Sequence, residues 1–291
     1  MESILEKMIS KYNTTNVLSK INAIKEVIQE VVLSSLSRTD FFDKAAFYGG
    51  TALRIFYNLN RFSEDLDFTL INKDDDFSLN KYFSIIEKEV NSLGLDFKIE
   101  SKIKHKESNI QTAYLKGNQI EHLLIFYPSN PNITFINPDQ VIKIKLEIDI
   151  NPPKFANFET KYRLDPFPYE ICLYDLPTLF SSKIAALLCR SWKNRIKGRD
   201  LYDFLYYTKL NTPFNLKHLE SRLIYNSVIK ENSNLTLENV KKLLNDKFDS
   251  INYEDAKKDV VNFIQDEKEL KGIEIWSKNL FKYFTKELKA K

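Results

Sequence analysis

Residues 47–70 read FYGGTALRIFYNLNRFSEDLDFTL, and they decide how the rest of the chain is interpreted. A Gly-Gly-Thr turn is followed by a short basic loop and then by Asp65-Leu66-Asp67 within an apolar run. Side chains alternate along a strand, so Asp65 and Asp67 are expected on one face. Two adjacent carboxylates repel each other unless a cation lies between them, and a glycine turn offers backbone N–H groups to phosphate oxygens. This combination is typical of metal-assisted phosphoryl or nucleotidyl transfer.

The 291-residue chain has the composition of a folded protein, with 43% hydrophobic and 13% aromatic residues. Lys and Arg number 43 against 40 Asp and Glu, so the net charge of +3 neither requires nor excludes a nucleic-acid partner. The two cysteines, Cys172 and Cys189, lie among apolar residues, which indicates buried thiols rather than a disulfide framework or a zinc site. A charged N-terminus and the absence of a long apolar run predict a cytoplasmic protein with no membrane association.

The spacing of apolar residues predicts helices and strands on both sides of the opening stretch. Residues 17–38 and 79–93 place apolar side chains at helical intervals, and a further helix is expected to start at Thr51, directly after the glycine turn. Residues 66–71 and 140–150 are predicted strands, the second because Ile and Leu alternate with charged residues.

The second half of the chain changes to a helical pattern. Pro177 is suited to the first turn of a helix over residues 178–191, and residues 199–210 predict another helix. We therefore expect an α+β protein with a strand-containing domain at residues 1–175 and a helical domain at residues 176–291.

Further polar residues in the first half could complete a phosphate and metal site. Arg61 and Ser63 add a cation and a hydroxyl group suited to phosphate oxygens, although a solvated loop explains them equally well. Glu147 and Asp149 offer the third carboxylate that a two-metal site needs. Asp149, at the strand end, is the preferred third ligand and Glu147 is the alternative; a half-exposed strand with alternating charges remains the competing explanation.

The predicted helices after Pro177 bring together a lysine and two aspartates. Asp200 and Asp203 share a helix face at i, i+3, and Lys183 lies among apolar residues, where an ammonium group is costly without a partner. Two interpretations stay open. Lys183 forms a structural ion pair with one of the aspartates, or it binds a triphosphate and is held in place by Asp200 or Asp203.

A basic cluster with one aromatic residue, Trp192, lies between these two helices. Such a cluster suits a nucleic-acid backbone with a stacked base, although a solvated linker is the alternative. Its members are Arg190, Lys193, Arg195, Lys197 and Arg199.

The motifs G-G-T-A-L, R-x-S-x-D-L-D-F, K-x-x-A-L and R-D-x-Y-D-F, in this order between Phe47 and Leu205, resemble those of the AbiEii/AbiGii-type toxin nucleotidyltransferases. That family belongs to the DNA polymerase beta-like nucleotidyltransferase superfamily. The resemblance implies a nucleotidyltransferase fold, with a mixed β-sheet flanked by helices, followed by a helical C-terminal region. The gap between Gly50 and Asp65 is at or slightly beyond the usual spacing of the superfamily.

The resemblance also implies roles for individual residues. The nucleotide phosphates would be contacted by Gly49, Gly50, Thr51, Ser63 and Lys183, with Arg61 nearby. Asp65 and Asp67 would hold Mg²⁺ together with Glu147 or Asp149, and Asp200 or Asp203 would complete the catalytic site.

The activity so implied is Mg²⁺-dependent transfer of a nucleoside monophosphate from an NTP to an RNA acceptor, such as a tRNA 3′ end. The protein would be the toxin of a toxin–antitoxin or abortive-infection system, with a separately encoded antitoxin. Two alternatives are a nucleotidyltransferase that modifies a protein or a small molecule such as an antibiotic, and a catalytically inactive nucleotide-binding regulator. The second alternative predicts the loss of a carboxylate, and both Asp65 and Asp67 are present.

Overall fold

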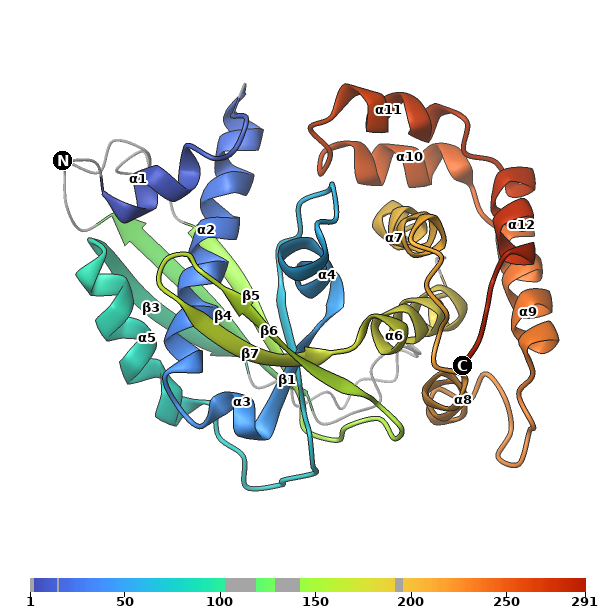
Figure 1. The fold of residues 1–291 in the computed structure, drawn as a ribbon, viewed down its shortest axis with the longest axis horizontal. Helices are drawn as coiled ribbons and strands as arrows, with labels where there is room; N and C mark the ends of the chain where they lie inside the picture. Colours follow the sequence, from blue (N-terminus) through green and yellow to red (C-terminus); the bar gives the residue numbers. More distant parts are fainter. Residues whose placement is uncertain (1–2, 15, 103–118, 129–141, 192–195) are drawn as a thin grey trace.

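A computed structural model describes residues 3–14, 16–102, 119–128, 142–191 and 196–291 of the chain. Within these residues seven strands form one mixed sheet in the order β3-β4-β5-β2-β1-β7-β6 (Figure 1). The strands are β1 (Ala45–Tyr48), β2 (Leu66–Leu70), β3 (Leu95–Lys102), β4 (Gln119–Pro128), β5 (Ile142–Asp149), β6 (Phe158–Arg163) and β7 (Tyr169–Tyr174). The predicted fold class, a mixed sheet flanked by helices, is confirmed.

The helices lie beside the sheet in the first half of the chain and pack on one another in the second (Figure 1). Those of the first half are α1 (Ile4–Ile9), α2 (Val17–Ser37), α3 (Phe41–Lys44), α4 (Gly49–Tyr57) and α5 (Asn80–Ser92). Those of the second half are α6 (Leu176–Cys189), α7 (Gly198–Lys209), α8 (Leu216–Tyr225), α9 (Leu237–Asp249), α10 (Tyr253–Val261), α11 (Glu267–Glu274) and α12 (Lys278–Lys286). In the described part of the chain, no helix combines the length and the apolar character that crossing a bilayer requires.

Local sequence signals explain where the long helices begin. Asn16 caps α2 by accepting a hydrogen bond from the backbone N–H of Ser19, whose side chain returns the contact. Asp175 caps α6 by accepting a hydrogen bond from the backbone N–H of Thr178, and Pro177 occupies the first turn as predicted. Helix α2 then buries apolar residues against β5 and β7, so one predicted amphipathic helix supports the centre of the sheet.

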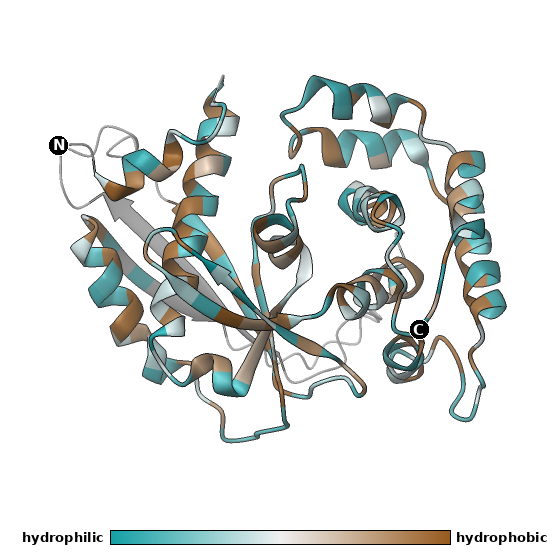
Figure 2. Cartoon of the chain, in the orientation of Figure 1, coloured by the Kyte–Doolittle hydropathy of each residue, from teal (hydrophilic) through white to brown (hydrophobic). Residues whose placement is uncertain are grey.

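Helix α4 lies between the sheet and the C-terminal helices (Figure 1) and is mostly hydrophobic (Figure 2), whereas hydrophilic residues predominate on α11. It begins at Gly49 rather than at the predicted Thr51, because the chain turns into the helix directly after β1. Its N-cap, Tyr48, makes no side-chain capping hydrogen bond. The first turn of α4 therefore presents backbone N–H groups that the helix itself does not use.

The strand register decides which polar side chains meet at the centre of the sheet. Strands β1 and β2 are antiparallel and pair Tyr48 with Asp67. Strands β2 and β5 are parallel and pair Asp67 with Glu147. The last strand of the described residues ends at Tyr174, next to the predicted boundary at residue 175. The division into two domains there stays a prediction.

Candidate active site

Two half-buried carboxylates lie at the start of the central strand β2. Asp65 directly precedes the strand and Asp67 is its second residue. Burial raises the pKa of Asp67 well above its ordinary value, and the negative charges of Asp65 and Glu147 add to the shift. Burial also raises the pKa of Asp65, against the attraction of Lys145. The pair therefore concentrates negative charge in a poorly solvated position, which a cation would stabilise.

The strand register places Glu147, rather than the preferred Asp149, opposite Asp67, and the choice of a third metal ligand stays a prediction. The register places Glu147 opposite Asp67 and Asp149 opposite Thr69, further along β2. The surroundings of Asp149 are instead the backbone of Asn151 and the guanidinium group of Arg222. Alternation along β5 puts both acidic residues on one face, so only the pairing of the two strands could distinguish them. Glu147 also forms an ion pair with Lys145.

The donor set fits Mg²⁺ bound together with a nucleotide. Within the described residues, no group of three or more His, Cys, Asp or Glu side chains is arranged to hold a metal ion by itself. However, Mg²⁺ is usually held by one or two carboxylates plus substrate phosphates. Asp65 and Asp67 offer these carboxylates, and the phosphates of an NTP would supply the remaining oxygens.

The glycine turn brings the first turn of α4 against the carboxylates. A Cβ atom at Gly49 would lie 2.3 Å from Oδ2 of Asp67, and one at Gly50 would lie 3.0 Å from Oγ of Ser63. The backbone of Gly49 is in the left-handed region, with φ of 86°. The position predicted for phosphate, at the N-terminus of α4, is thus directly adjacent to the position predicted for metal.

Thr51 has a different role from the one predicted. Its side chain is fully buried, and its hydroxyl group donates a hydrogen bond to the main-chain oxygen of Asp65 at 2.5 Å. The side chain therefore ties α4 to the residue that enters β2. The sequence could not show this, because the contact depends on how the helix packs on the following strand.

Replacement of Gly49 by alanine is expected to reduce both stability and activity. The added Cβ would collide with Asp67, and the left-handed backbone costs a residue with a side chain about 1–2 kcal/mol. Urea denaturation and a transfer assay would measure the two effects. Gly272→Ala is the matched control, because a Cβ on Gly272 in α11 would have nothing within 4 Å. Equal behaviour of the two variants would contradict the assigned contact.

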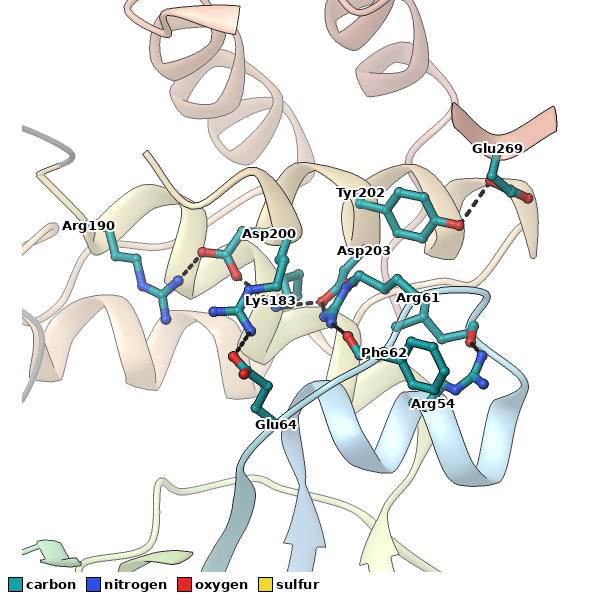
Figure 3. Close-up of polar contacts among 12 residues, drawn as sticks. Arg54, Arg61, Phe62, Glu64, Lys183, Arg190, Asp200, Tyr202, Asp203 and Glu269 are labelled. Atoms are coloured by element: carbon teal, nitrogen blue, oxygen red, sulfur yellow. Dashed lines mark hydrogen bonds and ion pairs between the residues drawn. The ribbon is translucent and has the colours of Figure 1, made fainter. Parts of the chain in front are cut away.

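Arg61 is buried in an ion pair with Asp203 beside Gly50, and its contact with phosphate stays a prediction. It is only 2% exposed, and its Nε and Nη2 atoms donate to Oδ1 and Oδ2 of Asp203 at 2.6 and 2.7 Å (Figure 3). A third hydrogen bond joins Nη1 to the main-chain oxygen of Phe62. The guanidinium group therefore anchors the loop before Asp65 to helix α7. Sequence spacing could not reveal this, because Arg61 and Asp203 are far apart in the chain.

Lys183 forms ion pairs with both candidate aspartates, an arrangement that both interpretations of this residue contain. Its Nζ atom is 2.8 Å from Oδ1 of Asp200 and 2.7 Å from Oδ2 of Asp203 (Figure 3). Burial opposes the charge of Lys183, but the two carboxylates outweigh it and raise its pKa. Asp200 also pairs with Arg190. Lys183 acts electrostatically on Asp67, so the cluster adjoins the carboxylates of β2.

The basic cluster predicted for RNA binding is only partly within the described residues, since Lys193, Arg195 and Trp192 lie outside them. Arg190 pairs with Asp200, and Arg199 pairs with Glu64 at 3.3 Å. Lys197 is half-buried, and burial followed by repulsion from Arg190 lowers its pKa. Lys197 and Arg199 therefore lie near Asp65, and Arg190 and Arg199 are engaged in ion pairs.

Glu64 and Lys145 are site residues that sequence reasoning missed. Glu64 binds Lys25 of α2 at 3.0 Å as well as Arg199 of α7, so it joins the two halves of the chain immediately before Asp65. The positive charge of Lys145 opposes the rise in the pKa of Asp65 and of Asp67 that burial causes. The sequence could have indicated Glu64 because it directly precedes the Asp65-Leu66-Asp67 motif. It could have indicated Lys145 because alternation along the strand puts Lys145 and Glu147 on the same face.

A mixed sheet, paired carboxylates and an uncapped helix that begins with Gly49 and Gly50 are together what the sequence motifs led us to expect of a nucleotidyltransferase. A family model described as "Nucleotidyl transferase AbiEii toxin, Type IV TA system" matches residues 31–279. The chain therefore belongs to the AbiEii family of nucleotidyltransferase toxins, as its motifs predicted.

Two solved structures from Helicobacter pylori resemble the chain in fold. JHP933 shares 19% sequence identity with a TM-score of 0.51, over 91% of this chain and 93% of that one. A candidate nucleotidyltransferase shares 19% identity with a TM-score of 0.47, over 92% of this chain and 97% of that one. No protein with a curated description matches the chain.

Proposed function

We propose that the protein transfers a nucleoside monophosphate from an NTP to an RNA acceptor in an Mg²⁺-dependent reaction. The observation that carries the proposal is the contact between Asp67 and Gly49, which brings a carboxylate pair against an uncapped helix N-terminus. Carboxylates for a metal ion and N–H groups for phosphate oxygens are thereby adjacent, as transfer from a triphosphate requires.

In this reaction, individual residues would have the following roles. The backbone N–H groups of Gly49 and Gly50 would bind the terminal phosphates and stabilise the charge that develops on the leaving pyrophosphate. Ser63, beside Gly50, would add a hydroxyl group. Lys183 would contribute positive charge from its fixed position, and Asp200 and Asp203 would hold it there.

Asp65 and Asp67 would hold Mg²⁺, with Glu147 as the nearest further carboxylate. When bound, the ion would neutralise the triphosphate and lower the pKa of the attacking hydroxyl group. The attacking oxygen would form a bond to the α-phosphorus while the bond to pyrophosphate breaks.

RNA is the acceptor that the surroundings of the site favour. Lys197 and Arg199 interact electrostatically with Asp65, Arg190 pairs with Asp200 nearby, and positive side chains suit a phosphate backbone. A tRNA 3′ end is the specific acceptor that we propose. Membership of a type IV toxin–antitoxin family supports a role as a toxin with a separately encoded antitoxin.

Incubation with each α-labelled NTP and total RNA would test the proposal. We expect label in RNA, including tRNA, with release of pyrophosphate in the presence of Mg²⁺ and no reaction after chelation by EDTA. Parallel incubations with protein extract and aminoglycosides test the other acceptors. Label in those fractions alone would assign the alternative acceptor, and NTP binding without any turnover would assign a regulatory role.

A further inference from the structure

We infer that residues 262–269, which comprise the α10–α11 connection and the first turn of α11, position the loop of residues 58–64 and thereby the carboxylates of the proposed catalytic site that follow it. The inference rests on the proposed function for its catalytic consequence, whereas the contacts themselves are structural. It assigns a role to part of the helical C-terminal half, which the motifs do not reach.

Main-chain contacts join the two segments directly. The backbone N–H of Phe62 donates to the main-chain oxygen of Phe263 at 2.8 Å. Arg61 and Ile264 form an isolated antiparallel bridge beside this hydrogen bond. The side chains of Phe62 and Ile264 are both buried. The loop before Asp65 thus pairs with residues 263–264 of the C-terminal half in the way that two antiparallel strands pair.

Glu269 adds the principal side-chain contact. Its Oε1 atom accepts a hydrogen bond from Nδ2 of Asn60 at 3.0 Å, and its Oε2 atom accepts one from the hydroxyl group of Tyr202 at 2.9 Å. Figure 3 shows Tyr202 and Glu269 facing each other above the loop that carries Arg61. One carboxylate of α11 therefore joins the loop to α7.

Helix α7 and the α10–α11 connection hold the loop together. From α7, Asp203 binds Arg61 and Arg199 binds Glu64. The guanidinium group of Arg199 also lies 4.2 Å from the centre of the Phe263 ring, so the two supports contact each other. Backbone packing fixes α10 against α7, because a Cβ atom at Gly198 would lie 1.8 Å from the main-chain oxygen of Ala256.

Loop position is transmitted to the carboxylates through a short covalent path. Glu64 is the last residue of the loop and Asp65 follows it directly. The main-chain oxygen of Asp65 is also held by Thr51 of α4. A shift of the loop would therefore move Asp65 relative to the phosphate position at Gly49 and Gly50, and small displacements of reacting groups cost much of the rate.

Glu269→Ala tests this positioning role, with Glu267→Ala as the matched control. Both residues are acidic and lie in the first turn of α11, so both substitutions change the helix-end charge equally. For Glu269→Ala we expect kcat for NTP turnover to fall about 10-fold with KM unchanged. Glu269→Gln, which keeps one acceptor oxygen, should recover part of the rate. Glu267→Ala should behave as the wild type.

Hydrogen exchange at the Phe62 amide gives a readout that does not depend on turnover. We expect Glu269→Ala to increase this exchange about 10-fold while amides of the β2–β5 pair keep wild-type protection. Exchange equal to that of Glu267→Ala would overturn the inference, and so would faster exchange with unchanged kcat. If the wild type does not turn over NTP, the proposed function fails, and the exchange alone decides whether Glu269 holds the loop.

Discussion

Replacement of Asp67 by asparagine is expected to lower nucleotidyl transfer about a thousand-fold while raising the free energy of unfolding. Metal coordination contributes several kcal/mol to the transition state, and each 1.4 kcal/mol or so is tenfold in rate. In the folded protein, burial and the charges of Asp65 and Glu147 act against the ionised Asp67 side chain. An amide of the same size removes this repulsion. Transfer of labelled NMP and thermal unfolding measure the two changes.

Asp149→Asn is the control for this prediction. Asp149 also belongs to the central sheet, and burial also raises its pKa, but Arg222 and Asn151 are its neighbours. Its amide variant should retain transfer within about twofold of the wild type. Full activity of Asp67→Asn would refute the assigned metal role. Equal losses of transfer activity in both variants would show that Asp149 is as important as Asp67, so that the strand register does not decide which residue of β5 belongs to the site.

Replacement of Asp203 by alanine is expected to lower the free energy of unfolding by about 3–5 kcal/mol, because it breaks a buried ion pair from one side. Asp203 is fully buried and binds both Arg61 and Lys183. Without it, two buried cations face each other with Asp200 as their remaining carboxylate. The paired change Arg61→Met with Asp203→Leu should regain part of the loss, since an apolar pair of similar volume needs no charge compensation.

Urea denaturation would measure these differences, with Asp249→Ala as the comparison. Asp249 forms an ion pair with Lys282 near the surface of the same helical half, and its side chain is 46% exposed. Loss of such a pair costs about 0–1 kcal/mol. If Asp203→Ala lowered the free energy of unfolding no more than Asp249→Ala, the buried ion pairs of Asp203 would contribute no more to stability than an ion pair near the surface.

The sequence predicted the elements whose signals are local. The alternation in residues 140–150 predicted β5, and the apolar spacing of residues 17–38 predicted α2 almost to the residue. The order of the Gly-Gly turn and the Asp65-Leu66-Asp67 motif predicted the phosphate and metal positions as neighbours, because a turn, one helix and one strand suffice to bring them together.

These local signals could not predict contacts between segments that are far apart in the chain. The preference for Asp149 over Glu147 rested on the pattern within β5, whereas the pairing of β5 with β2 places Glu147 opposite Asp67; which of the two would be the third metal ligand stays a prediction. Arg61 was assigned to phosphate because a cation beside a phosphate motif is normally exposed, whereas tertiary packing buries it on Asp203. Both interpretations of Lys183 include an ion pair with an aspartate, and the fold supplies two, so the role of Lys183 in phosphate binding stays a prediction.

Asn60 and Glu269 lie 209 residues apart in the chain, and this separation has a bearing on synthesis. During translation the Gly-Gly turn and the Asp65-Leu66-Asp67 motif leave the ribosome long before the segment that steadies the loop between them. Contacts of such long range also form slowly, because a large loop must close first. A nascent chain thus contains the Gly-Gly turn and the Asp65-Leu66-Asp67 motif well before the segment that supports the loop between them has been synthesised.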